Sequence, residues 1–391
     1  MKVRLQWAIV LCAALFGLAA CGGKAPSTAA SSNAAAPVAA SGEVLNVYNW
    51  PDYIAEDTIK NFEAKTGIKV NYQLYSNNDV LAQNLVANPK AYDVVFPSAR
   101  PYAQQQLAQK LYAPLDKAAL KNWQNLDPAI LQGLQDIDPG NAHVVPYMWG
   151  TTGLGLNVGK VKAALGAGAP LDSWALLFNP ANAARLSSCG IGVLDDDLET
   201  YTAARIFRGQ DPNEFSPDAM REVKQTFVAV RPYIRKFGNS NELIDDLANG
   251  KLCLVLSYSG DIAQARDKAD ELAKASKGEA PEIEYVIPKE GALRWTDVVA
   301  VPAQSPHRAA AMQFINYLME PKVIADVSNF VAYANANTSA TQYLDEEVAK
   351  DPGVYPDAAV RARLVDSRLP SQADADRRKS NWDSIVYGLS L

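Results

Sequence analysis

Short apolar runs alternate with amphipathic segments from Val44 onward. Strand-like runs cover residues 44–48, 68–74 and 93–96, and segments with helical spacing of apolar residues, 55–66 and 79–86, lie between them. The order strand, helix, strand, helix, strand predicts a parallel sheet with helices on its faces. Ligands of such sheets bind at the carboxyl ends of the strands, so the turns at residues 49–53 and 97–100 are candidate sites.

The same alternation continues to the C-terminus. It predicts strands at 190–194, 252–258, 283–288 and 295–301, and helices at 217–230, from 260 onward and at 305–319. Ser216 is placed to cap the helix at 217–230. The final stretch looks helical and charged. Two α/β lobes are the natural packing of these elements, although the pattern does not show where the chain crosses between them.

The N-terminus has the features of an export signal. Residues 1–20 contain two cations within the first four positions, followed by an apolar run that is too short for a membrane-spanning helix. The run ends in Leu18-Ala19-Ala20-Cys21, which resembles the bacterial lipobox, and this predicts a lipid anchor on Cys21. Residues 22–42 are rich in Ala, Ser, Pro and Gly, as in a flexible linker. The folded part should begin near residue 43.

Two cysteines, Cys189 and Cys253, remain after the signal peptide and Cys21 are set aside. In an oxidising compartment a disulfide is the expected state of such a pair. A redox or metal pair is the alternative, but neither histidine of the chain lies near either cysteine in the sequence. A disulfide here would close a loop of sixty-odd residues and stabilise the fold by about 4 kcal/mol.

Composition narrows the class of protein. The chain has 391 residues, enough for two domains, with 48% hydrophobic and 20% charged residues, which is typical of a globular protein. The formal charge is −6, and removal of residues 1–20 deletes Lys2 and Arg4 and no acid, which leaves −8. An acidic chain is a poor candidate for nucleic-acid binding, which depends on Lys and Arg. A cationic or neutral small ligand suits it better.

Motifs for catalysis are missing from the sequence. There is no G-x-S-x-G elbow, no dinucleotide fingerprint, because Val158 stands where glycine is needed, no P-loop and no His/Cys cluster with zinc spacing. The acids of the run 195–199 could serve a glycosidase, but such a run is more often a solvated surface. We therefore expect neither an enzyme nor a cofactor or metal site.

One family resemblance covers nearly all of the mature sequence. The segment VYNWPDYI at residues 47–54 resembles the start of the bacterial extracellular polyamine-binding proteins of ABC importers, and the putrescine-binding type is the nearest. Further stretches match in the same order, at residues 79–81, 95–99, 145–153, 246–250, 287–291 and 333–337. The resemblance implies the type II periplasmic-binding-protein fold, an α/β fold with two hinge-connected lobes and central mixed sheets that close on a ligand, and a disulfide at Cys189 and Cys253.

The family's lobes can be placed on this sequence. Lobe 1 would contain residues 43–148 and about 270–340, and lobe 2 about 149–269 and about 341–391. The family's ligand contacts carry over to eleven positions: Trp50, Asp52, Tyr53, Ser98, Asp196, Glu199, Tyr258, Asp261, Trp295, Asp297 and Tyr333. Asp261 and Asp297 match the pair that grips an ammonium group, and Tyr333 matches an aromatic wall.

Several positions depart from the putrescine-binding pattern. Pro51 replaces a residue that is often serine, Tyr258 stands in place of tryptophan, and Trp295 and Asp196 are closer to the spermidine-binding type. Arg100 falls at a pocket position, where a fixed cation would repel a dication unless an acid such as Asp196 neutralises it or the side chain turns outward. The ligand class is thus better defined than the ligand.

The chemistry of a polyamine agrees with these residue types. Its protonated amines need carboxylates, and its methylenes need apolar faces, which aromatic rings supply together with an attraction for cations. Taken singly, each ring could be an ordinary core residue, and N-capping explains two of the three acids Asp52, Asp261 and Asp297 equally well. Their joint occurrence at matching positions favours a site.

The combined interpretation is a solute receptor in the periplasm. We expect a monomer that is anchored to a membrane only through lipid on Cys21, binds putrescine or a related polyamine and delivers it to an ABC permease in the inner membrane. The alternatives are a binding protein for another cationic or zwitterionic solute, an exported carbohydrate-active hydrolase and a surface interaction protein. A hydrolase would need two carboxylates that face each other across an open cleft.

Overall fold

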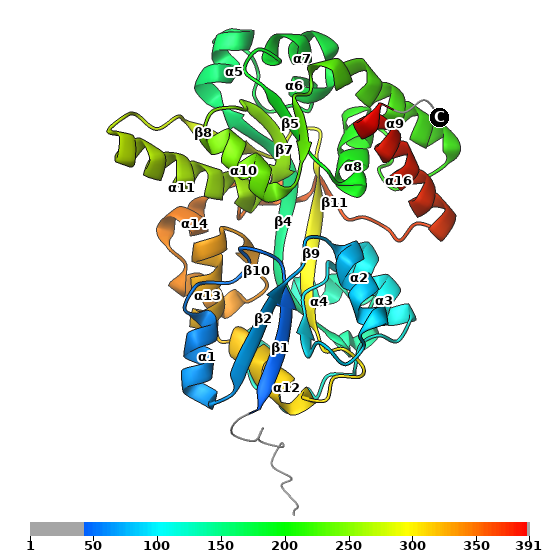
Figure 1. Ribbon diagram of the computed structural model, residues 1–391, viewed down its shortest axis with the longest axis vertical. Coiled ribbons are helices and arrows are strands. Elements are labelled where there is room, and N and C mark those ends of the chain that lie inside the picture. The colour runs from blue at the N-terminus through cyan, green and yellow to red at the C-terminus, as the bar shows by residue number, and fades with distance from the viewer. Residues whose placement is uncertain (1–42, 389–391) are drawn as a thin grey trace, which may run out of the picture. The chain divides into compact units, whose positions relative to one another are not determined.

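The computed structural model describes residues 43–388, which belong to one compact unit (Figure 1). The predicted signal peptide at residues 1–20, the lipidation site Cys21 and the linker at 22–42 lie outside the described residues. The structure therefore addresses the folded part of the predictions alone.

One mixed sheet runs through the described part of the chain. Its strands are β1 (Val44–Asn49), β2 (Lys69–Leu74), β3 (Val94–Val95), β4 (Val144–Asn157), β5 (Ile191–Leu194), β6 (Lys236–Gly238), β7 (Leu254–Tyr258), β8 (Ile283–Val286), β9 (Ala292–Ala300), β10 (Ala334–Asn335) and β11 (Leu364–Val365). The strand order is β2-β1-β3-β9-β4-β7-β5-β6, with β8 and β10 paired to β4 and β11 paired to β9. The strand pairs at the two ends of this order, β2 with β1 and β5 with β6, are parallel, whereas β4 pairs antiparallel with β7 and β9.

Helices connect and cover these strands (Figure 1). Their bounds are α1 (Thr58–Thr66), α2 (Asn78–Ala87), α3 (Gln104–Ala108), α4 (Pro128–Gly133), α5 (Val158–Leu165), α6 (Ala175–Phe178), α7 (Pro180–Leu186), α8 (Asp197–Phe207), α9 (Pro217–Val230), α10 (Ser240–Ala248), α11 (Ser259–Ser276), α12 (Arg308–Leu318), α13 (Pro321–Val331), α14 (Glu346–Lys350), α15 (Ala358–Arg361) and α16 (Gln372–Tyr387). Of the helices in residues 43–388, none is both long and apolar enough to cross a membrane.

The predicted β-α-β-α-β start is confirmed. Strand β1 pairs in parallel with β2 and with β3, and α1 and α2 form the connections. Helix α1 ends at Gly67, whose φ of 76° lies in the left-handed region that glycine adopts without a steric penalty. Helix α9 has the predicted bounds, and the Ser216 hydroxyl accepts a hydrogen bond from the Ala219 amide. These local signals act within a few residues, so the sequence shows them directly.

Strand β4 links two hydrophobic cores. Val145 and Met148, in its first half, pack in a core with α1, α12 and α13, whereas Leu154 and Leu156, in its second half, pack in a core with α5, α7 and α9. Strand β9 runs antiparallel along β4 from Leu293 to Ala300, so both strands pass from one half of the molecule to the other (Figure 1). The sequence pattern missed most of β4, because a strand buried on both faces shows no alternation of polar and apolar residues.

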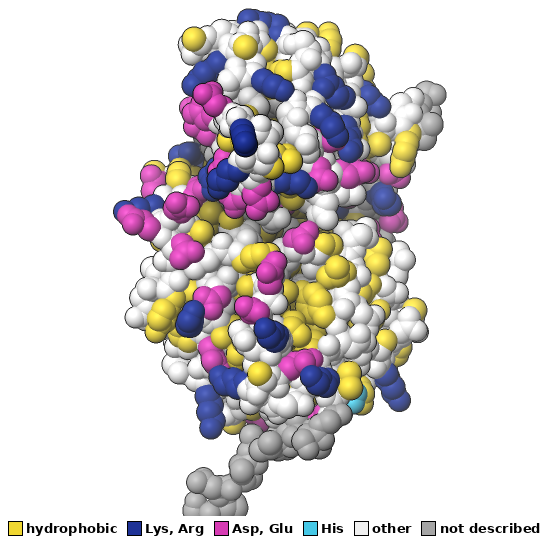
Figure 2. All heavy atoms as spheres, turned by 60° about the vertical axis from the view of Figure 1, so that its left-hand side comes forward, with side chains coloured by type: hydrophobic (Ala, Val, Ile, Leu, Met, Phe, Trp, Pro, Cys, Tyr) yellow, Lys and Arg dark blue, Asp and Glu magenta, His cyan; other side chains and the backbone are white. Residues whose placement is uncertain are grey.

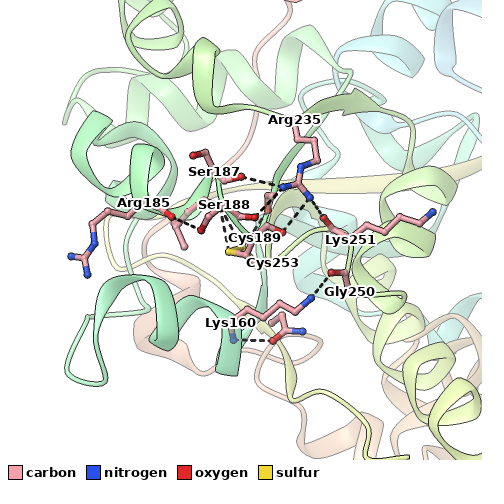
Figure 3. Close-up of a disulfide and its surroundings, with 12 residues drawn as sticks. Lys160, Arg185, Ser187, Ser188, Cys189, Arg235, Gly250, Lys251 and Cys253 are labelled. Atoms are coloured by element: carbon pink, nitrogen blue, oxygen red, sulfur yellow. Dashed lines mark hydrogen bonds between the residues drawn. A yellow bond between two sulfur atoms is a disulfide. The ribbon is translucent and has the colours of Figure 1, made fainter. Parts of the chain in front are cut away.

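The disulfide between Cys189 and Cys253 is confirmed, with the two Cα atoms 5.6 Å apart (Figure 3). Cys189 follows α7 and Cys253 precedes β7, within the core that contains Leu154. The Arg235 guanidinium donates hydrogen bonds to backbone carbonyls beside both cysteines, those of Ser187, Ser188, Cys189 and Lys251. One cation thus binds both cross-linked segments.

Candidate functional site

Two tyrosine–aspartate pairs meet where the two cores adjoin. Tyr53, after β1, donates a hydrogen bond of 2.8 Å to Asp297 of β9. Tyr333, which precedes β10, donates one of 3.0 Å to Asp261, in the first turn of α11. The two tyrosine rings are 5.7 Å apart between centroids and meet edge to face. Carboxylates from opposite halves of the molecule are therefore brought together, as the sequence predicts for Asp261 and Asp297.

Aromatic rings form a wall beside these pairs. The Trp295 ring lies 5.0 Å from Tyr333 and 5.8 Å from Tyr258 between centroids, in edge-to-face contacts. Trp50 is fixed on the side of β1, where its indole N–H donates a hydrogen bond of 2.8 Å to the Phe96 carbonyl. Rings from both halves therefore present their faces and edges around the acids.

Two glycines let this wall form. A Cβ atom on Gly150, in β4, would lie 2.4 Å from Cζ2 of Trp295, and one on Gly260, in α11, would lie 2.5 Å from Cζ of Tyr333. Contacts below 3 Å do not occur for real Cβ atoms, so any larger residue at either position would displace a ring. The absence of a side chain is what brings Trp295 and Tyr333 against the backbone.

Unpaired polar atoms gather at the same place. Among residues 43–388, nine buried side-chain polar atoms lack a hydrogen-bond partner, and five of them belong to this region. Buried polar groups are nearly always paired, so such a cluster indicates a position for a ligand. The five atoms are Thr152 Oγ1, Glu199 Oε2, Ser259 Oγ, Trp295 Nε1 and Asp297 Oδ1. Thr152 and Glu199 are close to each other, and the Thr152 hydroxyl acts to lower the pKa of Glu199.

Burial raises the pKa values of the carboxyl groups at this site. Desolvation raises the pKa of Asp297 to about 6, although the nearby hydroxyls of Ser98 and Tyr53 act in the opposite direction. Desolvation also raises the pKa of Asp261, and it raises the pKa of Glu199 well above its usual value, with the nearby Asp196 adding to the effect. A buried ammonium ion would reverse these shifts, because an opposite charge favours the ionised acid.

The exterior differs from this interior. On the face shown in Figure 2, acidic and basic side chains are interspersed. Surface acids commonly have a basic neighbour, such as Asp326, which is 3.0 Å from Lys322. The site therefore contrasts with the surface in holding acids that carry unpaired oxygens. No group of three or more His, Cys, Asp and Glu side chains in residues 43–388 is arranged to hold a metal ion.

Asp196 caps helix α8. Its Oδ1 accepts hydrogen bonds from the backbone N–H groups of Leu198 and Glu199, at 2.9 and 3.0 Å, and so caps α8. Burial and the neighbouring Asp197 raise its pKa to about 6. Asp197 in turn accepts a hydrogen bond of 2.7 Å from Arg378 of α16. The acidic run that looked like a solvated surface is thus largely bonded to other parts of the fold.

Asp52, Ser98 and Arg100 lie at the edge of the site. Asp52 is exposed and has a φ of 51°, and the structure does not bring it into the group of buried acids. The Ser98 backbone pairs with that of Asp297, and its hydroxyl accepts a hydrogen bond from Asn78. The Arg100 guanidinium pairs with the carboxylate of Asp136 and donates to the Gly133 carbonyl, so its charge is neutralised by Asp136 and not by Asp196.

Sequence reasoning missed three hydroxyl residues of the site. Ser257 donates a hydrogen bond of 2.7 Å to Asp261, and Thr152 and Ser259 contribute two of the unpaired atoms. The position of Ser257 within the otherwise apolar run LCLVLSY was a signal, because a polar residue in a buried strand needs a partner. Thr152 lies within β4, whose extent was not predicted, and so gave no signal.

Comparison with known proteins identifies the family. Residues 57–356 match the family described as bacterial extracellular solute-binding protein. The chain belongs to this family. Its solved relatives include the spermidine/putrescine ABC transporter substrate-binding protein PotD from Streptococcus pneumoniae, with a TM-score of 0.71 and 23% identity over 88% of this chain and 98% of that one. The predicted two-lobed periplasmic-binding-protein fold is confirmed.

Two curated members of the family are more similar in sequence. The putrescine-binding periplasmic protein SpuD of Pseudomonas aeruginosa is 41% identical over 92% of this chain and 96% of its own length. The putrescine-binding periplasmic protein PotF of Escherichia coli is 42% identical over 90% of this chain and 93% of its own length. These solute-binding proteins therefore match the chain along almost its whole length.

Proposed function

We propose that this protein is the periplasmic substrate-binding component of an ABC importer and that it captures putrescine or a related di- or polyamine between its two lobes. One observation carries the proposal. Asp261 and Asp297 come from different cores, are each bonded by a tyrosine, and lie beside the same aromatic rings in a buried region with unpaired acceptor oxygens. The names of the two curated relatives support the same ligand class.

The roles of the side chains follow from the chemistry of the cargo. Asp261, Asp297 and Glu199 would receive ammonium groups, since charge-assisted hydrogen bonds between buried partners are strong. The rings of Trp295 and Tyr333 would cover the methylenes and attract the cationic ends. Further contacts are proposed for Trp50, Tyr53, Ser98, Asp196 and Tyr258, with Asp52 at the rim.

The two cores suggest how the molecule would close. We place the lobes on either side of the crossing strands β4 and β9, with Val145 in the core of lobe 1 and Leu154 in that of lobe 2. Ile283 packs in the same core as Leu154, so we place the return crossing in β9 and not near residue 270, where the family resemblance put it. A ligand that contacts both lobes favours the closed form, which is the form a permease would recognise.

The remaining parts of the proposal concern location and assembly. Cys21 would carry the lipid that anchors a monomeric, non-catalytic receptor to a membrane, with residues 22–42 as the tether. Mass spectrometry of the mature N-terminus tests this directly. A mass that lacks a diacylglyceryl group on Cys21 would rule the anchor out.

A thermal-shift panel tests the proposed ligand class. The purified protein would be melted with putrescine, cadaverine, spermidine, spermine or arginine, each at the same concentration. A ligand that binds only the native state increases the free energy of unfolding, by about 2.7 kcal/mol at a hundredfold excess over Kd, and so raises the melting temperature. We expect putrescine or another polyamine to do so. A panel in which no amine raises the melting temperature would refute the proposal, and a response to arginine alone would favour another cationic solute.

A further inference from the structure

Helix α11 belongs to lobe 2 but also faces a segment that follows α14. Its residues Ala265 and Ala269 pack in the core that contains Leu154. Residues three and four apart lie on one face of a helix, and such a stripe of α11 lines a small cavity together with residues of the segment 351–354. The stripe consists of Ser259, Ile262, Ala263 and Arg266.

The segment 345–355 is bonded to lobe 1 at both ends. At its start, the Asp345 amide donates a hydrogen bond of 2.9 Å to the side chain of Asn329, in α13. At its end, the Tyr355 hydroxyl accepts a hydrogen bond of 3.4 Å from the Asn335 amide, in β10. We therefore count this segment with lobe 1, and not with lobe 2, where the family resemblance put it.

The contact between α11 and lobe 1 begins at the candidate site and continues along the helix. A Cβ atom on Gly260 would lie 2.5 Å from Cζ of Tyr333, so the backbone of α11 lies against that ring. One turn further along, Ala263 packs in a small buried cluster with Val354. The first turns of α11 thus touch lobe 1 at successive points that lead away from the proposed ligand contacts.

An ion pair lies at the outer end of this contact. Arg266 Nη1 donates a hydrogen bond of 3.4 Å to Oδ2 of Asp351, and its Nε is 3.9 Å from Asp267 on the same helix. Arg266 lies about 9 Å along the helix axis from Gly260. Because a helix moves as a rigid element with its lobe, the Arg266–Asp351 pair should form and break together with the contact of Gly260 on the Tyr333 ring.

We propose that the Arg266–Asp351 ion pair stabilises the closed form and so raises the affinity for the ligand from outside the proposed ligand contacts. This proposal rests on the proposed function and adds a pair of residues that controls it. A receptor that populates its closed form less binds its ligand more weakly in the same proportion. The Arg266 side chain is 43% exposed and that of Asp351 20%, so the effect should be modest.

A double-mutant cycle tests the proposal. Isothermal titration would use putrescine, or the amine of the thermal-shift panel that raises the melting temperature most, with Arg266→Gln, Asp351→Asn and the double variant. Asn at position 351 keeps an oxygen for the Gly353 amide, which donates to Asp351 Oδ1 at 2.8 Å. We expect each single variant to weaken binding about threefold, and the double variant to weaken it no further.

Lys322→Gln is the matched control. It removes an ion pair of 3.0 Å with Asp326 that lies within α13 and so joins no two lobes. Its dissociation constant should equal that of wild type. An effect as large as that of Arg266→Gln would mean that any lost surface charge weakens binding, and it would overturn the proposal.

The outcomes separate this proposal from the proposed function. If wild type binds the amine and Arg266→Gln binds it equally well or more tightly, the ion pair does not stabilise the closed form, and the polyamine function stands. Effects of Arg266→Gln and Asp351→Asn that multiply in the double variant would mean that the two residues act separately, which also overturns the proposal. If wild type binds no amine of the panel, both proposals are wrong.

The dissociation rate gives a readout that a purely structural role would not change. The ion pair must break before the lobes open and the ligand leaves, so stopped-flow displacement should show about threefold faster release from Arg266→Gln. The association rate should stay within about twofold of wild type. A lower free energy of unfolding with an unchanged release rate would show that the pair only stabilises the fold, and it would overturn the proposal.

Discussion

At the scale of single residues, the site is defined by buried acids that lack full pairing. Removing a carboxylate from water is unfavourable unless it gains hydrogen bonds and an opposite charge. Asp297 receives a hydrogen bond from Tyr53, and Asp261 receives hydrogen bonds from Tyr333 and Ser257, yet the pKa of each acid remains raised by burial. Asp297 and Asp261 are therefore available to pair with the cationic groups of a ligand.

The raised pKa of Asp297 predicts weaker ligand binding in acid. Ammonium groups of this kind titrate near pH 10, so the ligand stays charged, whereas Asp297 becomes protonated as the pH falls through about 6. The pairing is present above that pH and is lost below it. We expect the dissociation constant for putrescine to be about tenfold weaker at pH 5 than at pH 7 for each acid that titrates. Isothermal titration across this range measures the change.

Asp297→Asn is the variant that isolates this effect. It should weaken putrescine by about 2–5 kcal/mol at pH 7, as truncation of one partner in a buried charge pair does, and it should flatten the pH dependence. Asp57→Asn is the control, because Asp57 is exposed and precedes α1 on the same lobe. An unchanged affinity in Asp297→Asn would place Asp297 outside the ligand's contacts.

At the scale of secondary structure, the site is assembled from the junctions between strands and helices. Asp261 lies in the first turn of α11 and Glu199 in the first turn of α8. Helix N-termini carry partial positive charge and so favour the ionised form of both acids. This arrangement offsets part of the desolvation at the two positions where the ligand's charge is expected.

Gly260→Ala tests how closely α11 must approach the aromatic wall. The new methyl group would overlap the Tyr333 ring, so the ring and its hydrogen bond to Asp261 must shift. We expect a loss of about 1–3 kcal/mol in the free energy of unfolding, together with weaker putrescine binding. Chemical denaturation and titration measure the two effects.

Gly133→Ala is the matched control for that substitution. A Cβ atom on Gly133, in α4, would meet nothing within 4 Å, so both quantities should stay close to wild type. Normal putrescine affinity in Gly260→Ala would show that the position of the Tyr333 ring does not matter for the ligand.

The same junctions explain how much of the site the sequence predicted. The turn that contains Tyr53 was predicted because ligands of α/β sheets bind at the carboxyl ends of strands, whereas Asp261 was predicted from the family resemblance. The burial of Thr152 and the exposure of Asp52 were not, because they depend on where β4 crosses between the cores and on a left-handed turn at Asp52. Local patterns specify the elements, whereas side-chain direction in loops and crossing strands is set by tertiary packing.

At the scale of the whole molecule, the core that contains Val145 and the core that contains Leu154 share one sheet, so their stabilities are coupled through β4 and β9. The disulfide belongs to only one of these cores, that of lobe 2, where Cys253 is fully buried. The residues that we propose to contact the ligand come from both sides of the crossing strands. A change confined to the disulfide should therefore affect stability without removing any proposed ligand contact.

The variant Cys189→Ser/Cys253→Ser makes this separation measurable. The two cysteines are 64 residues apart, and losing a cross-link over a loop of that length lowers the free energy of unfolding by about 4 kcal/mol on the chain-entropy estimate. Arg235 still bonds the carbonyls beside both positions, so the segments should remain in place. Denaturant unfolding should show the loss, while titration with putrescine at 25 °C should give a dissociation constant within about twofold of wild type, since changes away from a site add little to binding. A large loss of affinity with little loss of stability would mean that the disulfide acts on the site, and not mainly on the unfolded chain.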